Sequence, residues 1–307
     1  MDTTRKVLET IRNAHPPRLY IASDGPRKNM QGDEEKVKAV REYVMGNIDW
    51  DCKVKTLFRG KNLGCRKAVS EAVTWFFENE EQGIILEDDC LPSQSFFWFS
   101  EELLEKYKDN PRVMHISGNN LQHGISRTPD SYYFSCYTHI WGWASWRRAW
   151  KCYDIDMNLW NKEKISLAVR EIGGGWKPFE EYWIRRFEEV FSKKIDTWDY
   201  VWLFSCWMHG GLAVIPEVNI VENIGFGPDA THTKTQYNNF IPERSEIQFP
   251  LRHPKQIVRC LAADRYTDRK HYCIRPHIPN FLRRFLRVPY KAIKIMRAGF
   301  MRLKNRK

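Results

Sequence analysis

Residues 83–91 read GIILEDDCL, an apolar run that ends abruptly in three acids. β-Branched and apolar residues that follow a glycine predict a buried strand, so Glu87, Asp88 and Asp89 stand at its carboxyl end. Open α/β sheets bind their ligands at that end of their strands. Adjacent carboxylates repel one another, and a hard divalent ion shared with a phosphate is the usual compensation. A solvated acidic turn is the alternative interpretation.

Strand and helix patterns alternate ahead of this stretch. Residues 18–23 and 52–58 predict strands, and residues 33–46 and 65–79 carry apolar residues at helical spacing. Such alternation predicts an α/β fold with a mostly parallel, Rossmann-like sheet that is flanked by helices. We expect this domain to span residues 1–273.

The amino-acid composition limits the classes of protein to which the chain can belong. The chain has 307 residues, 42% of them hydrophobic, which is enough for one large core or two modest ones. Its 13 tryptophans suit a surface that stacks on sugar rings or bases. No apolar stretch approaches the ~18 residues of a membrane span, and the N-terminus lacks the apolar core of a signal peptide, so a cytoplasmic protein is expected. The eight cysteines form no CxxC or CxxH pair, which argues against structural zinc and favours free thiols.

The formal charge of +11 is concentrated in residues 274–307, which contain eleven Lys or Arg and no acid. The rest of the chain is therefore near neutral, which removes most of the support for a nucleic-acid partner. Between Tyr290 and Lys304, apolar residues fall on one helical face and basic residues mostly on the other. This basic amphipathic tail predicts a helix that anchors the protein to an anionic membrane surface. A disordered basic tail or a nucleic-acid arm is the alternative.

Six stretches follow one another in a recognisable order: ASDGPR (22–27), NLGCRKAV (62–69), IILEDDC (84–90), WGWASWRRAW (141–150), WDYVW (198–202) and NIGFGPDATH (223–232). Together they resemble the GT-A family of nucleotide-sugar glycosyltransferases, over residues 1–235. Within it, the sequence is similar to the bacterial, family 2-like enzymes that build lipopolysaccharide, capsule and related surface glycans. It is more distantly similar to the animal N-acetylglucosaminyltransferase that starts hybrid N-glycans.

The resemblance implies that Glu87, Asp88 and Asp89 form the family's variant of the DxD motif. Asp89 would bind the Mn²⁺ or Mg²⁺ that bridges the two phosphates of a nucleoside diphosphate sugar, with a UDP-sugar favoured. Asp88 would reach the ribose hydroxyls, and Glu87 the donor sugar. A metal at this place would neutralise, as a Lewis acid, the charge that develops on the departing nucleoside diphosphate.

Arg66 and Asp24 precede the acids in the sequence and match positions that contact the nucleotide in the family. Arg66 opens the helix that follows the loop Gly60–Gly64, where a cation beside a helix N-terminus suits an anion. Its alternative is a surface arginine. Asp24 matches the position that recognises the base, and its alternative is an ordinary Asp-Gly turn.

Asp199 and His232 follow the acids in the sequence and complete the predicted site. Asp199 is the candidate catalytic base, because aromatic neighbours raise a carboxyl pKa toward the working range and inverting relatives have an aspartate at this place. The alternative is that Asp196 or Asp199 is only the N-cap of the next helix. His232 lies where many GT-A enzymes have a histidine that touches the metal or the pyrophosphate, and its alternative is a solvated loop histidine.

The tryptophans offer a further candidate site. Trp143 and Trp198 are candidates for a platform on which an acceptor or donor sugar stacks, and a tryptophan-rich core is the alternative. In the loop 223–232, Asn223 and Gly225 are expected to shape the backbone rather than to react.

Relatives in the family begin with a strand and an Asn-Arg-Pro-like turn ahead of the segment that here reads DTTRKVLETIR. This chain opens directly on that helix. We therefore expect either a start codon that is assigned too late or a truncated chain, whose sheet would lack a central strand.

The sequence thus predicts a metal-dependent, inverting glycosyltransferase, peripheral at the inner face of the cytoplasmic membrane. Its acceptor would be a lipopolysaccharide, capsule or other surface glycan, or a lipid-linked glycan. A metal-dependent phosphoryl-transfer enzyme is the first alternative, although it needs a second set of acids for a second metal. A truncated, non-catalytic module that binds nucleotide or glycan is the second.

Overall fold

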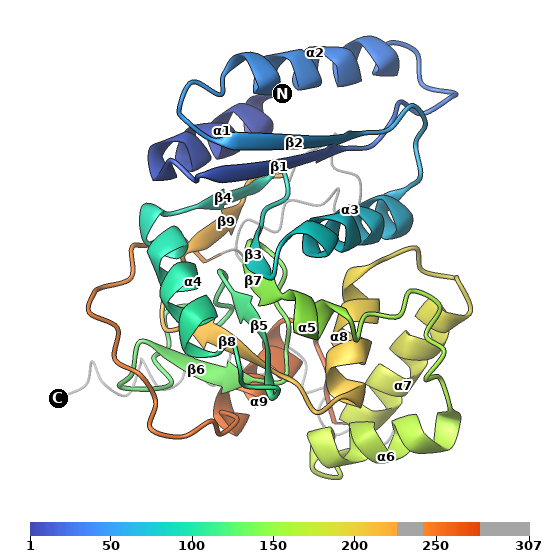
Figure 1. Ribbon diagram of the computed structural model, residues 1–307. Coiled ribbons are helices and arrows are strands. Elements are labelled where there is room, and N and C mark those ends of the chain that lie inside the picture. Colours follow the sequence, from blue (N-terminus) through green and yellow to red (C-terminus); the bar gives the residue numbers. More distant parts are fainter. Residues whose placement is uncertain (226–241, 277–307) are drawn as a thin grey trace, which may run out of the picture. The chain divides into compact units, whose positions relative to one another are not determined.

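The computed structural model describes residues 1–225 and 242–276 and has an α/β fold (Figure 1). Met1–Cys273 form one compact unit, the same range that the sequence suggested for the catalytic domain, and every helix and strand named below belongs to it. His232 and residues 277–307, which carry most of the predicted membrane anchor, lie outside the described residues.

The largest sheet has five strands and is mixed. Its strand order is β3-β7-β5-β8-β6, and these strands are β3 (Gln82–Ile85), β7 (Trp143–Trp146), β5 (Val113–Ser117), β8 (Leu212–Pro216) and β6 (Tyr132–Ser135). Only β5 and β8 run parallel, while the other three pairings are antiparallel. The prediction of a mostly parallel sheet is therefore wrong. The difference comes from the aromatic stretch 132–150, which supplies β6 and β7, and both of these strands run antiparallel to every strand that they pair with.

The predicted βαβ unit near the N-terminus is present. Strands β1 (Arg18–Ser23) and β2 (Lys53–Phe58) are parallel and in register from Arg18 opposite Lys53 to Ser23 opposite Phe58. The helix α2 (Asp33–Gly46) connects them, as a parallel pair requires. This pair forms a two-stranded sheet of its own and does not continue into the five-stranded sheet, so the single sheet expected from the sequence is divided.

A third, small sheet holds the acidic stretch in place. Strand β4 (Cys90–Pro92) follows the acids directly and pairs antiparallel with β9 (Val221–Asn223). The acids thus occupy the connection between β3 and β4, and β9 carries residues from the far end of the chain to their side.

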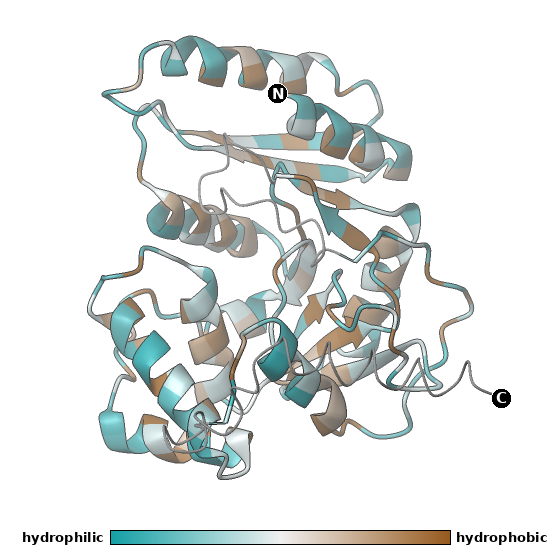
Figure 2. Cartoon of the chain, turned by 180° about the vertical axis from the view of Figure 1, so that it is seen from behind, coloured by the Kyte–Doolittle hydropathy of each residue, from teal (hydrophilic) through white to brown (hydrophobic). Residues whose placement is uncertain are grey.

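The remaining helices surround these sheets (Figure 1). They are α1 (Asp2–Ala14), α3 (Cys65–Asn79), α4 (Gln94–Lys106), α5 (Arg147–Trp150), α6 (Lys162–Gly173), α7 (Lys177–Phe191), α8 (Asp199–Met208) and α9 (Leu261–Lys270). In Figure 2, α2 at the top alternates polar and apolar bands along its length, as expected for a helix with one face toward strands. None of the helices in the described part of the chain is both long and apolar enough to cross a membrane.

The main core lies between α4 and the five-stranded sheet. Phe96, Phe99 and Leu103 of α4 and Ile116 and Val214 of the sheet have no exposed surface. The burial of each such side chain stabilises the fold by about 1.5–3 kcal/mol relative to the same side chain left exposed. This core fixes the sheet from which the acidic connection extends.

Candidate active site

The acidic connection forms a tight turn at the carboxyl end of β3, as the sequence predicted. The backbone N–H of Cys90 donates to the carbonyl of Glu87 at 3.0 Å and closes the turn. Asp88 is exposed, and its carboxylate accepts a hydrogen bond from Thr4 Oγ1 of α1 at 3.3 Å. The sequence offered no signal for this contact with Thr4.

Asp89 is held by the segment that follows β9. The N–H of Ile224 donates to the carbonyl of Asp89 at 2.8 Å. A Cβ on Gly225 would lie 2.2 Å from Asp89 Oδ2, so only glycine fits beside this carboxylate. The side chain of Asn223 accepts the N–H of Gly225 at 2.9 Å. Asn223 and Gly225 therefore shape the loop around Asp89, in the way the sequence suggested.

The carboxyl groups of the site share one negative field. Burial raises the pKa of Glu87 to about 8, and the charges of Asp89, Asp199 and Asp88 add to that rise. Burial, followed by the charge of Asp88, raises the pKa of Asp89 as well. Glu87 Oε1 is buried, and no hydrogen-bond partner for it exists among the described residues. Glu87 thus keeps a proton at neutral pH unless a cation reaches the site.

Asp199 belongs to the same site although it is distant in the sequence. It is the first residue of α8, and its Oδ1 accepts hydrogen bonds from Thr197 Oγ1 and, at 2.8 Å, from the N–H of Tyr200. The N-cap residue of α8 is Trp198. Neither Asp196 nor Asp199 is therefore the cap, and that interpretation is wrong.

The acids converge on the N-terminal end of α3. Burial raises the pKa of Cys65 to about 12, and the charges of Glu87, Asp199 and Asp196 contribute to the rise. Asp196 is exposed, and its Oδ2 would lie 3.4 Å from a Cβ on Gly64, the N-cap of α3. Cys65 was not among the predicted site residues, and its place directly before Arg66 was the only signal that could have found it.

Asp24 fixes the loop that precedes α3. Its carboxylate accepts the backbone N–H groups of Gly25 at 2.9 Å, Leu63 at 2.9 Å and Gly64 at 3.2 Å. A Cβ on Gly25 would lie 2.3 Å from the backbone nitrogen of Lys61, so the two loops interlock only with glycine at this position. In this structure Asp24 holds a turn together, and its predicted contact with a base stays a prediction.

Arg66 is not the surface arginine that the sequence left open. The residue is only 8% exposed. Its guanidinium donates to the carbonyl of Val190 at 3.3 Å and to the carbonyl of Ile155. The side chain therefore spans from α3 to the end of α7 and to the loop that follows α5.

The two candidate platform tryptophans lie in the core. Trp143 is 0% and Trp198 2% exposed, and their rings stack with centroids 5.6 Å apart. His115 stacks on Trp143 as well, at 5.2 Å. Neither indole offers an open face to a sugar, so the platform assignment is corrected to the alternative of a tryptophan-rich core.

Carboxylate oxygens are the ligands that hard divalent ions prefer, and Asp88 and Asp89 present them at the end of β3. Glu87 adds a buried oxygen without a hydrogen-bond partner among the described residues. Within residues 1–225 and 242–276, however, no group of three or more His, Cys, Asp or Glu residues could hold a metal ion by itself. A phosphate would therefore have to supply part of the coordination, as Mg²⁺ sites in nucleotide enzymes require.

A search of protein-family models and a search of curated proteins both gave no match to this sequence. The chemistry of the site follows from its geometry. A protonated carboxyl, two further acids at a strand end and a hydrogen-bonded aspartate on a neighbouring helix suit a reaction in which a proton is accepted while an anion departs.

Proposed function

We propose that the chain is a metal-dependent, inverting glycosyltransferase that moves a sugar from a nucleoside diphosphate donor, with a UDP-sugar favoured, to a surface-glycan acceptor. One observation carries the proposal. Glu87, Asp88 and Asp89 at the end of β3 and Asp199 at the start of α8 share one electrostatic field. The resemblance of the six sequence stretches to GT-A enzymes supports the same reaction class.

Asp88 and Asp89 would hold Mn²⁺ or Mg²⁺, which supplies charge neutralisation for the departing nucleoside diphosphate. With that cation bound, the Glu87 carboxylate would accept a hydrogen bond from a hydroxyl of the donor sugar. Thr197 Oγ1 and the Tyr200 N–H fix the orientation of the Asp199 carboxylate.

The transfer is a single displacement at the anomeric carbon. The acceptor oxygen forms a bond to that carbon, and the bond from the carbon to the phosphate oxygen breaks. Asp199 accepts the proton of the acceptor hydroxyl, and the electron pair leaves with the nucleoside diphosphate. Attack from the opposite face inverts the configuration.

Calorimetric titration with a panel of nucleoside diphosphates, with and without Mn²⁺, tests the donor site. We expect one nucleotide to bind only with metal and Asp89→Ala to lose that binding. Binding of no nucleotide would refute the proposal and leave a glycan-binding module as the better description. Transfer of a phosphoryl group in place of a sugar would favour the phosphoryl-transfer alternative.

We further propose that residues 274–307 keep the enzyme at the inner face of the cytoplasmic membrane, next to a lipid-linked acceptor. The eleven basic residues of this segment support the proposal. Deletion of the segment should release the protein from anionic vesicles and leave hydrolysis of a soluble donor intact. Unchanged vesicle binding would contradict it.

A further inference from the structure

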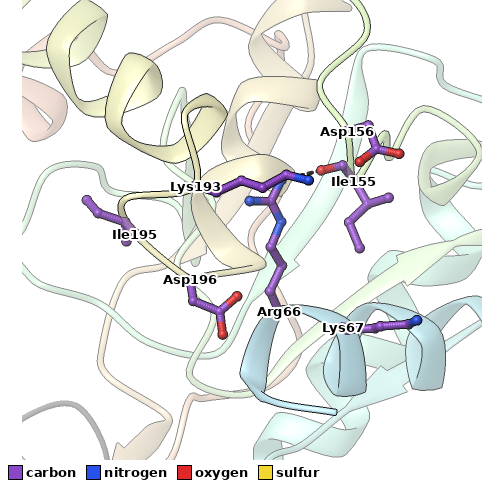
Figure 3. Close-up of a pocket in the computed structure, with 7 residues that line it drawn as sticks. All are labelled: Arg66, Lys67, Ile155, Asp156, Lys193, Ile195 and Asp196. Atoms are coloured by element: carbon purple, nitrogen blue, oxygen red, sulfur yellow. Dashed lines mark hydrogen bonds between the residues drawn. The ribbon is translucent and has the colours of Figure 1, made fainter.

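A pocket of about 200 Å³ lies between the first turn of α3, the loop after α5 and the segment after α7 (Figure 3). Its lining includes three cations, Arg66, Lys67 and Lys193, and two acids, Asp156 and Asp196. In Figure 3 the side chains of Arg66 and Lys193 point toward each other, while Lys67 extends away along α3. The pocket therefore concentrates two positive charges at one place.

These two cations lack a carboxylate partner in the described part of the chain. Lys67 forms an ion pair with Glu71 at 3.6 Å, whereas no described acid forms one with Arg66 or Lys193. Arg66 is nearly buried, and the two carbonyls that it contacts satisfy hydrogen bonds without balancing its charge. Buried charges in proteins are normally paired, so the charge of Arg66 could be balanced by a bound anion, which the exposed Lys193 could also contact.

The backbone at the end of α7 fixes the position of Lys193. Lys193 has φ of 59°, in the left-handed region that residues other than glycine seldom adopt. Its N–H donates to the carbonyl of Val190 at 3.0 Å, and the N–H of Lys194 donates to that of Glu189 at 2.9 Å. These two bonds form a Schellman motif, in which Lys193 takes the left-handed position directly after the C-cap Ser192. The motif fixes the point at which the Lys193 side chain leaves the end of α7, and glycine is the residue most often found at this position.

The pocket borders the acidic site on the side of the proposed base. Asp196 lines the pocket and lies three residues before Asp199. Leu159 and Phe191 follow and precede lining residues closely in the sequence, are 45% and 42% exposed, and Phe191 stacks on Trp160 with ring centroids 5.0 Å apart. An anion in the pocket would therefore lie on the side of the proposed base, with exposed apolar side chains in the same two segments.

We propose that this pocket binds a phosphate group of the acceptor, through Arg66 and Lys193. The assignment of the phosphate to the acceptor rests on the proposed function, whereas the phosphate site itself does not. Guanidinium and ammonium groups form charge-assisted hydrogen bonds with phosphate oxygens. The phosphate either carries a long apolar chain, which would lie on Leu159 and Phe191, or belongs to a water-soluble molecule.

Inorganic phosphate, titrated calorimetrically into the full chain at low ionic strength without divalent ions, is the first probe. We compare the wild type with Lys193→Gly, which suits the left-handed backbone, and with Lys194→Ala, a neighbouring lysine outside the pocket lining. Loss of one charge-assisted contact predicts about tenfold weaker binding for Lys193→Gly. Lys194→Ala should change the affinity less than twofold.

Two further probes identify the source of the phosphate. Dodecyl phosphate below its micelle concentration should bind more tightly than inorganic phosphate if the acceptor is a lipid phosphate, and Phe191→Ala should then remove only that excess. Equal affinity for both probes assigns the pocket to a water-soluble phosphate. Absence of binding by either probe, or equal weakening by the Lys193 and Lys194 variants, would overturn the proposal.

The donor titration separates this inference from the proposed function. If Lys193→Gly weakens the metal-dependent binding of a nucleoside diphosphate as much as it weakens phosphate binding, the pocket belongs to the donor site and the inference is wrong. If phosphate binds in a Lys193-dependent way but no nucleotide binds, the pocket is supported while the glycosyltransferase proposal fails.

Discussion

Replacing Glu87 by glutamine should stabilise the metal-free protein. The pKa of Glu87 is about 8 in the folded chain and 4.5 in its reference state. Between these values the folded carboxyl keeps a proton that the unfolded one has lost, so folding becomes less favourable as the pH rises. Each pH unit between these two values lowers the free energy of unfolding by about 1.4 kcal/mol. At pH 7 the free energy of unfolding is thus lowered by at most about 3 kcal/mol.

Glutamine preserves the shape of the side chain and does not titrate. We expect the free energy of unfolding of Glu87→Gln, measured with urea in the presence of EDTA, to exceed that of the wild type by about 1 kcal/mol at pH 5.5 and about 3 kcal/mol at pH 7. Glu78→Gln, which changes an exposed glutamate of α3, is the matched control and should leave stability nearly unchanged.

A stability difference that is absent at pH 7, or that does not grow with pH, would refute the raised pKa of Glu87. The same variant should bind the donor sugar less well, because glutamine cannot form the charge-assisted hydrogen bond that the Glu87 carboxylate is proposed to accept from it. Gains in stability at the expense of function are common when active-site residues are replaced.

Three more outcomes follow from the structure. Gly225→Ala should displace Asp89 and weaken metal-dependent nucleotide binding at least tenfold, because its Cβ would overlap Asp89 Oδ2, and calorimetry measures this loss. Asp199→Asn should keep nucleotide affinity within twofold but lower the turnover number at least a hundredfold, since general-base catalysis contributes about that much, and full turnover would contradict the role of base. Burial lowers the pKa of His115 and His271 from 6.5 to about 4, so these imidazoles stay neutral in the fold and stability is lost as the pH falls from 6.5 toward 4. Each histidine should lower the free energy of unfolding by about 2 kcal/mol at pH 5. Urea unfolding measures this loss in the Glu87→Gln variant, which has no titrating group at position 87.

Local patterns in the sequence predicted the elements near the N-terminus well. The strand 18–23 and the helices 33–46 and 65–79 have the bounds that the sequence suggested, because each has a clear period and a glycine or proline near its ends. The stretch 132–150 has no clear period, since large aromatic side chains point to both sides of its short strands and are nearly all buried. Strand direction there depends on tertiary pairing, which a single sequence does not reveal.

Residue roles that depend on burial were harder to predict than residue positions. Trp143 and Trp198 are consistent with a sugar platform or with a core until the elements that cover them are known, and here they stack on each other. Arg66 has the sequence context of a surface residue, yet carbonyls from two distant segments bury it. In both cases long-range packing decided the role.

The position of the acids at the end of β3 was predicted correctly although the direction of the sheet was predicted wrongly, and the structure gives a reason. The acids depend on β3 only for their starting point, because their positions are fixed by other segments. Gly225 leaves room for Asp89, and Thr4 donates to Asp88. Neither contact depends on whether β7 runs parallel or antiparallel to β3. A glycine that allows close packing and carboxylates that follow a strand are local features of the sequence. The placement of such acids can therefore be predicted before the sheet topology is known.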